Sequence, residues 1–311
     1  MEIKTITIGT RGSPLALRQS NWIKETLTGF YPHLRIVIQE IRTTGDKILD
    51  CPLSAIGGKG LFVKEIEEAL LEKRIDIAVH SMTDMPGDLP GGLMIGAVPV
   101  REDPRDVLIS RDHRLLKDIP DGKSVGTSSL RRKAQLLHLR PDLQIIPLRG
   151  NLDTRIKKIE SEGLAGVVLA AAGIHRMGLQ NKISQYLDLE ASLPAVGQGA
   201  LALEIREDDP WFKDLVRVIH DEVTALCTQA ERAFLKRLQG GCQVPIAGHA
   251  RIQGERIILQ GLIAGLDGRE LFKDHVEGPT SDPINLGNRL AERLLLTGGK
   301  EVLDRVYENT P

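Results

Sequence analysis

The chain of 311 residues has few aromatic side chains and almost no net charge. Phe, Trp and Tyr make up 3% of the residues, and the formal net charge is -1 at pH 7. So few aromatic rings argue against the stacking surfaces that bind single-stranded nucleic acid, and a nearly neutral chain has no general attraction for polyanions. We therefore expect no nucleic-acid partner, and any anion must be bound by cations gathered in one place.

Cysteine is scarce, and histidine forms no metal-ligand pattern. The three cysteines, Cys51, Cys227 and Cys242, are far apart and odd in number, which is typical of a reducing cytoplasm rather than of a disulfide framework. The histidines lack HExxH spacing and the cysteines lack Cys-x-x-Cys spacing. We therefore predict no metal site.

Long apolar runs and an apolar leader are missing too. The longest apolar stretch, Gly166 to Gly173, is far shorter than the ~18 residues that a membrane span needs. Met1 to Lys4 lead straight into an alternating strand pattern instead of an apolar segment. These features predict a cytoplasmic protein without a membrane partner.

Strand-like and helix-like segments alternate along the first two thirds of the chain. Its length exceeds what one hydrophobic core usually serves, so two or three domains are expected. The predicted strands are 3–8, 35–41, 75–79, 93–98, 124–125, 143–147 and 166–170, and the predicted helices cover 14–27 and 61–71 and begin near 129 and 151. Such alternation predicts an α/β fold with mostly parallel sheets, covered by helices and binding ligands at the carboxyl ends of the strands.

The pattern changes from about residue 221. A predicted helix is followed by strands at 246–252, 256–264 and 269–276 and by a further helix, which indicates a small α+β domain. We expect three domains, formed by residues 1–99 with 200–220, by residues 100–199, and by residues 221–311. The chain is expected to cross between the first two near residues 99–104 and 192–199.

An anion site is predicted in the second domain. Residues 126–129, Gly-Thr-Ser-Ser, precede a helix, so backbone N–H groups and three hydroxyls meet where the helix dipole favours negative charge. The arginines at strand ends and helix starts of this domain are Arg131, Arg132, Arg149, Arg155 and Arg176. A planar guanidinium binds a carboxylate through two hydrogen bonds. Each arginine alone is better explained as a solvated surface residue, but their shared location favours an anion site.

Cys242 follows the predicted end of a helix. Phe234, Leu235 and Leu238 have helical spacing, and Gly240 with Gly241 predicts a left-handed stop. The thiol then lies on a loop with little bulk beside it, where a thiolate can carry a large attached group. The alternative is a small buried cysteine beyond a helix end.

The sequence around this cysteine resembles a known signature. The block from Glu231 to Ile246 is similar to the cofactor-attachment segment of the porphobilinogen deaminase family, also called hydroxymethylbilane synthases. Further motifs similar to those of the family follow in order: Gly9 to Ala16, Gly57 to Phe62, His80 to Pro86, Arg101 to Asp106, Gly126 to Arg132, Arg149 to Arg155 and Pro194 to Ala200. The resemblance implies two doubly wound α/β domains like those of bilobal anion-binding proteins, plus a small C-terminal α+β domain that carries the cofactor.

The resemblance also implies a reaction. Four porphobilinogen molecules are deaminated and added to a dipyrromethane primer attached through Cys242, and hydrolysis releases hydroxymethylbilane for tetrapyrrole biosynthesis. Asp84 is implied as the catalytic carboxylate that accepts from pyrrole N–H groups and stabilises the cation formed as ammonia leaves. Its alternative is a turn aspartate before Met85 and Pro86.

The resemblance implies further site residues that hold the acetate and propionate groups of each ring. The cofactor-binding set is Cys242, Ser81, Thr83, Asp84, Thr127, Ser129, Arg131, Arg132, Arg155 and Lys59, and the substrate-binding set is Arg11, Ser13, Arg149, Arg155, Arg176 and Gln198. Residues 47–58 resemble the mobile loop over the family's active site, on which Cys51 is expected to be incidental. Cys227 falls in an apolar helical pattern and is expected in the core.

Thr83 departs from the family, which usually has a lysine immediately before the aspartate. We expect the missing ammonium to weaken the grip on a cofactor or substrate carboxylate, unless another cation such as Lys59 takes its place.

The partners that the resemblance implies are porphobilinogen and the growing linear pyrrole chain. The protein is expected to be a monomer that hands its product transiently to the next enzyme. A non-catalytic bilobal anion-binding module is the chief alternative, but it leaves the cysteine turn unexplained. A phosphoryl-transfer enzyme built on Gly57 to Gly60 is disfavoured, because the lysine of a P-loop is followed by Ser or Thr.

Overall fold

The computed structural model describes residues 5–47, 60–241 and 244–308. These residues form two compact units. The first contains the described residues of Met1–Leu49, Gly58–Glu102 and Ala200–Ala225, and the second those of Asp103–Gly199 and Leu226–Pro311. The three domain boundaries expected from the sequence remain a prediction.

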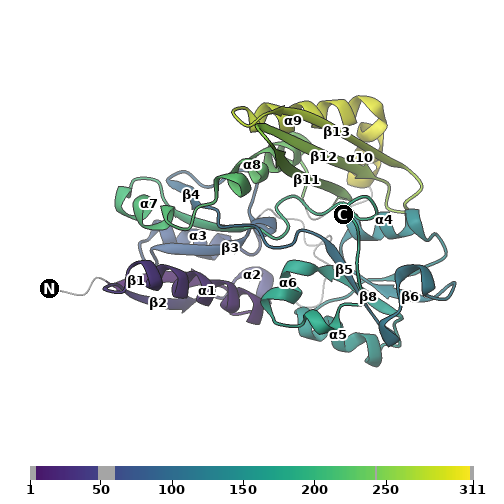
Figure 1. Cartoon of the computed structure of the whole chain (residues 1–311), viewed down its shortest axis with the longest axis horizontal. Coiled ribbons are helices and arrows are strands. Elements are labelled where there is room, and N and C mark those ends of the chain that lie inside the picture. Colours follow the sequence, from purple (N-terminus) through teal and green to yellow (C-terminus); the bar gives the residue numbers. More distant parts are fainter. Residues whose placement is uncertain (1–4, 48–59, 242–243, 309–311) are drawn as a thin grey trace. The chain divides into compact units, whose positions relative to one another are not determined.

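The first unit is built on a five-stranded sheet in the order β2-β1-β3-β10-β4 (Figure 1). Its elements are β1 (Thr5–Thr10), α1 (Pro14–Phe30), β2 (Arg35–Glu40), α2 (Thr44–Lys47), α3 (Lys64–Leu71), β3 (Ile77–Ser81), the 3-10 turn η1 (Met82–Asp84), β4 (Leu93–Ala97), β10 (Leu201–Arg206), α7 (Pro210–Arg217) and the first turn of α8 (Glu222–Arg237). β1 is parallel to β2 and β3, whereas β10 is antiparallel to both β3 and β4. Four strands therefore share one direction, which confirms a mostly parallel sheet.

Helices cover both faces of this sheet. On one face Leu203 of β10 shares a core cluster with Ile23 of α1 and Phe212 of α7. On the other face Ala78 of β3 clusters with Leu70 of α3. Because successive side chains of a strand point to opposite faces, the next even-numbered positions of β3 and β10 also lie under α3.

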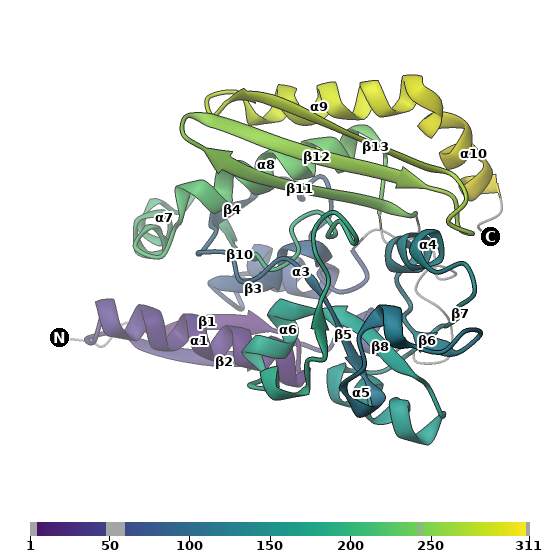
Figure 2. The same ribbon diagram turned by 45° about the vertical axis from the view of Figure 1, so that its right-hand side comes forward.

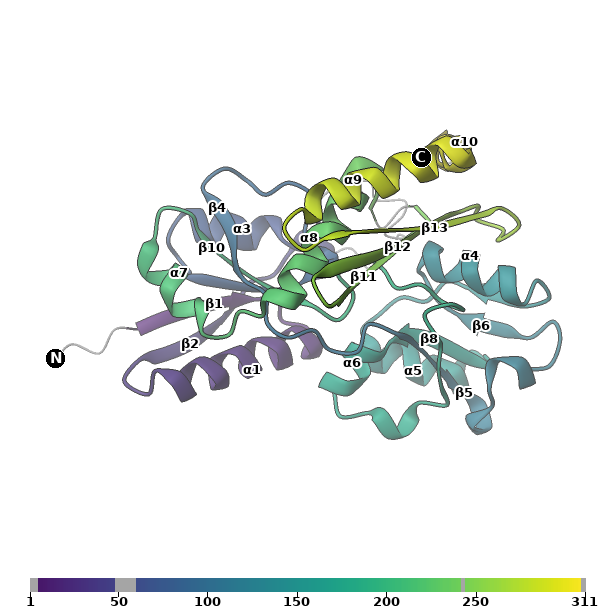
Figure 3. The same cartoon turned by 45° about the horizontal axis from the view of Figure 1, so that its top comes forward.

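The second unit contains a sheet of the same design, in the order β7-β6-β8-β5-β9. Its elements are β5 (Asp106–Ser110), η2 (Arg111–His113), η3 (Leu116–Asp118), β6 (Ser124–Gly126), α4 (Leu130–Leu139), β7 (Gln144–Ile146), α5 (Leu152–Ser161), β8 (Gly166–Ala170), α6 (Ala171–Arg176), η4 (Gln180–Lys182) and β9 (Gln185–Tyr186). β5 is antiparallel to both of its neighbours, and the other pairs are parallel. Figure 3 shows α4 and α5 on opposite sides of β6 and β8, where they cover two separate core clusters.

The remainder of the second unit is a three-stranded antiparallel sheet with helices. It comprises β11 (Ile246–Gln253), β12 (Arg256–Ala264), β13 (Leu271–Pro279), α9 (Pro283–Leu294), the π-helical turn η5 (Leu295–Gly299) and α10 (Lys300–Glu308). Figure 2 shows α9 running along this sheet. Phe234 of α8 packs so closely on the sheet that a Cβ at Gly261 would lie 2.7 Å from its ring. On the opposite face of this sheet, Leu262 belongs to the same core cluster as Ala134 of α4.

Local sequence patterns predicted the positions of many helices and strands correctly. The strands predicted at 166–170 and 256–264 have the same bounds in the structure, whereas the strand predicted at 75–79 lies at 77–81. Ser13 caps α1 by accepting a hydrogen bond from the Ala16 N–H at 3.3 Å, and Pro14 takes the first helical position as expected. The helix predicted from residue 61 begins only at Lys64.

The end of α8 differs from the prediction. The left-handed residue is Gln239, with φ 53°, and neither Gly240 nor Gly241 has a positive φ. Lack of room for a side chain explains why residue 240 is a glycine, because a Cβ there would lie 2.6 Å from Cδ1 of Leu235 and 2.7 Å from Cδ1 of Ile246. Glycine is needed at this position for close packing rather than for a left-handed backbone.

Across the described ranges, no helix combines the length and apolar character needed to cross a membrane.

Candidate functional site

Asp84 lies at the end of η1, directly after β3 in the first unit. Its Oδ2 atom is 3.6 Å from Nη1 of Arg11, which lies in the loop that leaves β1. Burial raises the pKa of the Asp84 carboxyl, while the charges of Arg11 and His80 and a hydrogen bond with the Thr83 side chain oppose the rise. The side chain keeps 32% of its surface exposed, so a ligand can reach it. A reachable carboxyl of this kind is suited to hold negative charge or to exchange a proton.

Arg11 is held in place by protein groups on two sides. Its Nη2 and Nε atoms lie 2.6 Å and 3.2 Å from Oδ1 of Asp46 in α2, and its guanidinium carbon lies 4.0 Å from the ring centre of Phe62. Burial works to raise the pKa of Asp46, but hydrogen bonds from Arg11 and Thr43 outweigh it, so the pKa is lowered. Asp46 is therefore a charged partner of Arg11 that sequence reasoning missed, because α2 gives no strong periodic signal.

Two serines predicted at this site make protein hydrogen bonds. Ser13 caps α1, as described above. The Ser81 hydroxyl accepts from Nε2 of Gln19 at 3.1 Å. Both hydroxyls thus hold the ends of β3 and α1 in position around Arg11.

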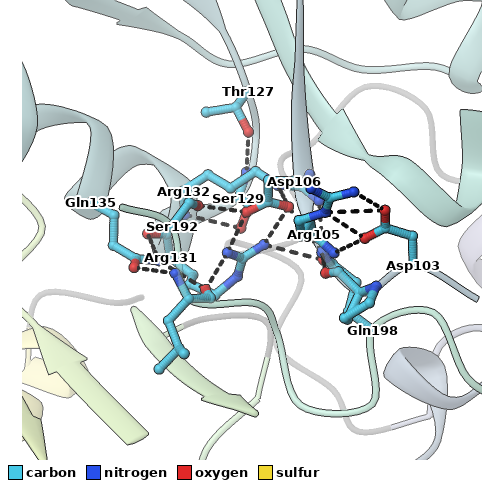
Figure 4. Close-up of polar contacts among 12 residues, drawn as sticks. Asp103, Arg105, Asp106, Thr127, Ser129, Arg131, Arg132, Gln135, Ser192 and Gln198 are labelled. Atoms are coloured by element: carbon cyan, nitrogen blue, oxygen red, sulfur yellow. Dashed lines mark hydrogen bonds and ion pairs between the residues drawn. The ribbon is translucent and has the colours of Figure 1, made fainter. Parts of the chain in front are cut away.

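In the second unit, a buried carboxylate organises the arginines that begin α4 (Figure 4). Asp106, the first residue of β5, accepts hydrogen bonds from Nη1 of Arg131 at 2.7 Å and from Nε of Arg132 at 2.8 Å. Ser192 and Gln198 donate to it as well, at 2.7 Å and 3.0 Å. Burial alone would raise the pKa of Asp106, but the charges of the two arginines lower it strongly. The sequence placed Asp106 in a motif but assigned it no role.

The structure brings Arg131, Arg132 and Gln198 together around this internal carboxylate. Arg131 is 4% exposed and also donates to the carbonyl of Leu193 at 2.7 Å and to Oε1 of Gln198 at 3.2 Å. The amide of Gln198 donates to the carbonyl of Pro104 at 2.6 Å. These contacts fix the start of α4 and with it the orientation of Arg132.

Three arginines of the second unit carry positive charge close together. Burial and the charges of Arg132 and Arg149 lower the pKa of Arg155 to about 10. Nη2 of Arg149 is buried and has no hydrogen-bond partner among the described residues, whereas Nε of Arg155 donates to the carbonyl of Gly150 at 2.9 Å. Within residues 5–47, 60–241 and 244–308, no carboxylate forms an ion pair with Arg149 or Arg155. Like charges held near one another in this way are suited to bind an anion.

Hydroxyls and helix starts surround these arginines. Ser129 caps α4 by accepting from the Arg132 N–H at 3.4 Å, and Oγ1 of Thr127 accepts from the Ser129 N–H at 3.3 Å. Asn151 caps α5 in the same manner. Arg176, at the end of α6, donates to the carbonyl of Gly199 at 2.8 Å.

Some predicted site residues lie outside the described part of the chain. These are Cys242 and Lys59, and with them Cys51 and nearly all of the predicted loop at 47–58. Cys227 is 4% exposed, which confirms its place in the core. In the described ranges, no group of three or more His, Cys, Asp or Glu side chains is arranged to hold a metal ion.

Comparisons with known proteins agree on one family. Residues 6–214 match "Porphobilinogen deaminase, dipyromethane cofactor binding domain", and residues 225–296 match "Porphobilinogen deaminase, C-terminal domain". Three similar curated relatives bear the name porphobilinogen deaminase. That of Pelobacter propionicus is 51% identical over 308 residues, covering 99% of both chains. That of Syntrophobacter fumaroxidans is 49% identical over 307 residues, again covering 99% of each. That of Brevibacillus brevis is 51% identical over 300 residues, covering 96% of each.

Among solved structures, the BenM effector-binding domain with benzoate is 18% identical, covers 70% of this chain and 93% of that one, and has a TM-score of 0.43. A likeness this weak adds nothing to the fold that the strand order already shows. The two family matches and the identity along nearly the whole length lead to one conclusion: the chain belongs to the porphobilinogen deaminase family.

Proposed function

We propose that this protein is a hydroxymethylbilane synthase, which deaminates four porphobilinogen molecules and joins them into a linear tetrapyrrole. The observation that carries the proposal is the group formed by Arg132, Arg149 and Arg155, in which Arg132 is paired with Asp106 but no described carboxylate pairs with Arg149 or Arg155. Every ring of the substrate brings an acetate and a propionate. A set of guanidinium groups is the chemistry that such a ligand needs.

The same residues fit the dipyrromethane cofactor that the family implies. Its rings bear the same two carboxylates as the substrate, and the buried Nη2 of Arg149 has no partner in the part of the chain that the structure describes. Arg132, Arg155 and the hydroxyl of Thr127 would hold these carboxylates close to the start of α4. When bound, the cofactor supplies the free pyrrole position to which the first substrate ring is joined.

Asp84 is proposed as the carboxylate of the reacting centre. Its oxygens accept the pyrrole N–H of the substrate and stabilise the positive charge that develops as ammonia leaves. Stabilisation of developing charge by a fixed group is usually the largest single catalytic contribution. Arg11, 3.6 Å away, orients the carboxylate and keeps its charged form available.

The remaining assignments belong to the same proposal. We propose covalent attachment through Cys242, a contribution from Lys59, and ligand contacts from Ser13, Ser81, Thr83, Ser129, Arg131, Arg176 and Gln198. The monomeric state, the cytoplasmic location and the hand-over of product to the next enzyme are predictions from the sequence.

Porphobilinogen consumption and intact-protein mass together test the proposed function. We expect the purified protein to carry the mass of a covalent dipyrromethane and to consume porphobilinogen with release of ammonia. Cys242→Ser should lose both, because an alcohol is a much poorer nucleophile than a thiolate. Cys227→Ala, which changes a core cysteine, is the matched control and should keep the adduct. A protein that binds porphobilinogen without consuming it would be a non-catalytic binding module, and the proposal would be wrong.

A further inference from the structure

The end of α8 lies just before Cys242 in the chain. The N–H of Gln239 donates to the carbonyl of Lys236 at 2.9 Å, and the N–H of Gly240 donates to the carbonyl of Leu235 at 2.9 Å. These two hydrogen bonds define a Schellman motif, in which the residue at the position of Gln239 takes a left-handed conformation. The turn that leads to the proposed attachment cysteine is therefore a defined helix end.

Gln239 is an unusual residue for the left-handed position of this turn. Its φ is 53°, a conformation that glycine adopts easily and that residues with a Cβ rarely adopt. Such a backbone persists only where the surrounding structure holds it in place. A glycine would form the same two hydrogen bonds without this cost, so the turn in this chain needs support from another part of the fold.

Tyr307 of α10 provides this support. Its hydroxyl donates to the carbonyl of Gln239 at 3.1 Å and, more weakly, to the carbonyl of Leu238 at 3.5 Å. The last carbonyl groups of a helix have no partner within the helix, and the Schellman hydrogen bonds use only two earlier ones. Burial raises the pKa of the Tyr307 phenol, so the hydroxyl keeps the proton that it donates.

Packing keeps Tyr307 within reach of this turn. Val306 of α10 belongs to the same buried core cluster as Phe234 and Leu238 of α8. Because the two helices share one core, the backbone that carries Tyr307 is fixed relative to the end of α8. The hydroxyl then joins two segments that lie 68 residues apart in the chain.

We propose that Tyr307 is a positioning residue that fixes the end of α8 and, with it, the point from which the covalent primer extends. This inference rests on the proposed function, which takes Cys242 as the attachment point. Tyr307 touches no reacting atom in it. A primer held firmly at its anchor samples fewer positions at its free end, and a small displacement of a reacting group lowers the rate strongly. Fixing the anchor therefore raises kcat, whereas substrate binding depends on other contacts.

The kinetic experiment compares full-length wild type with Y307F, which removes one hydroxyl and keeps the ring. Intact-protein mass gives the fraction of each protein that carries dipyrromethane, and kcat is calculated for that fraction alone. We expect kcat of Y307F to be about tenfold lower than that of wild type, with KM for porphobilinogen little changed. Y31F is the matched control, because it removes the same hydroxyl from the residue that follows α1 in the first unit, and it should equal wild type.

A second variant separates positioning from a merely structural role. If the Tyr307 hydroxyl only stabilised the fold, Y307F would unfold at a lower urea concentration while its folded, cofactor-loaded molecules kept the wild-type kcat, and that result would overturn the inference. Glycine takes a positive φ at no steric cost, so the double variant Y307F/Q239G should regain most of the lost kcat. A double variant no more active than Y307F would also overturn the inference, because the fault would not lie in the conformation of residue 239.

Amide hydrogen exchange gives a readout that does not depend on enzymatic activity. The amides of Gln239 and Gly240 donate the hydrogen bonds of the turn, so in Y307F they should exchange about tenfold faster than in wild type, while the amides of α1 should keep their rates. Equal exchange of the turn in the two proteins would overturn the inference. A wild type that carries no dipyrromethane and consumes no porphobilinogen would refute the proposed function instead, and hydrogen exchange would still decide whether Tyr307 holds the end of α8.

Discussion

Arg11 lies closer to Asp46 than to Asp84, with Nη2 2.6 Å and Nε 3.2 Å from Oδ1 of Asp46. The distance from Arg11 to Asp84 is 3.6 Å, so the cation is divided unequally between two carboxylates. The charge of Asp46 itself raises the pKa of Asp84. The carboxylate proposed for catalysis is therefore only partly neutralised by its nearest cation.

Asp84→Asn should preserve the shape of this site and remove its negative charge. We expect kcat to fall by roughly 100-fold or more, as is typical when one preorganised electrostatic group is lost. Steady-state kinetics with porphobilinogen measures the effect, and Asp208→Asn, an exposed carboxylate of the same unit, is the control. A raised KM with normal kcat would assign Asp84 to binding alone.

Arg149→Gln and Arg155→Gln should hinder particular additions to the growing chain. Arg149→Gln removes one of the charges that lower the pKa of Arg155, and Arg155→Gln removes the Arg155 guanidinium itself. In either variant the carboxylates of the later rings lose a binding partner. Native mass spectrometry after brief exposure to substrate should show an accumulation of protein that carries partly extended pyrrole chains. Arg269→Gln changes an exposed arginine and should give the wild-type pattern. The wild-type pattern in both Arg149→Gln and Arg155→Gln would exclude a role for these arginines in binding the growing chain.

Asp106→Asn should destabilise the second unit strongly. The substitution leaves Arg131 and Arg132 buried without their counter-charge, and breaking a buried ion pair from one side costs about 3 to 5 kcal/mol. Urea unfolding of the full chain, followed by a signal from the second unit, measures the change. Asp142→Asn breaks an exposed pair with Arg140 and should shift the unfolding midpoint far less. Equal shifts in the two variants would contradict a structural role for Asp106.

Thr83→Lys should strengthen binding of a cofactor or substrate carboxylate by restoring the cation usual in the family. A charged hydrogen bond is worth roughly 1.5 to 3 kcal/mol where both partners are positioned. The lysine also removes the hydrogen bond between Thr83 and Asp84, so Thr83→Ala is needed to separate the two effects. The measurements are kcat/KM for porphobilinogen and the thermal stability of the cofactor-loaded protein. No gain in either one would mean that Thr83 is a compensated substitution.

The pH dependence of stability should contain a contribution from Glu67. Burial and the charge of Glu204 raise the pKa of Glu67 to about 7 in the folded protein, whereas an ordinary glutamate releases its proton near pH 4.5. A pKa raised by folding gives stability that is complete below the unfolded value and is lost as pH rises through the folded one. The wild type should therefore lose up to about 3 kcal/mol between about pH 4.5 and 7 from this group.

Glu67→Gln should lack this loss, so its stability relative to wild type should increase with pH across that window. Urea unfolding at a series of pH values tests the difference, with Glu25→Gln, which changes an exposed carboxylate of α1, as control. Parallel curves for wild type and Glu67→Gln would show that Glu67 titrates at its ordinary pH in the folded protein.

The sequence by itself determined the types of element and several helix caps, and it predicted which residues bind carboxylates. Hydrophobic periodicity and capping are local properties, which is why 166–170 and 256–264 were predicted with their observed bounds and why Ser13 was placed at a helix start. The order of motifs around Cys242 indicated the family before any coordinate was known.

Only the tertiary structure decided which charges neutralise one another. Asp106 meets Arg131 across 25 residues, Arg11 meets Asp46 across 35, and His80 meets Glu204 across 124. Such pairs depend on strand order, register and the helix that covers a face, none of which leaves a periodic trace in the chain. For this reason the sequence identified Arg131 and Arg149 as alike, whereas folding gives Arg131 an internal carboxylate and leaves Arg149 with a buried donor that no described residue accepts.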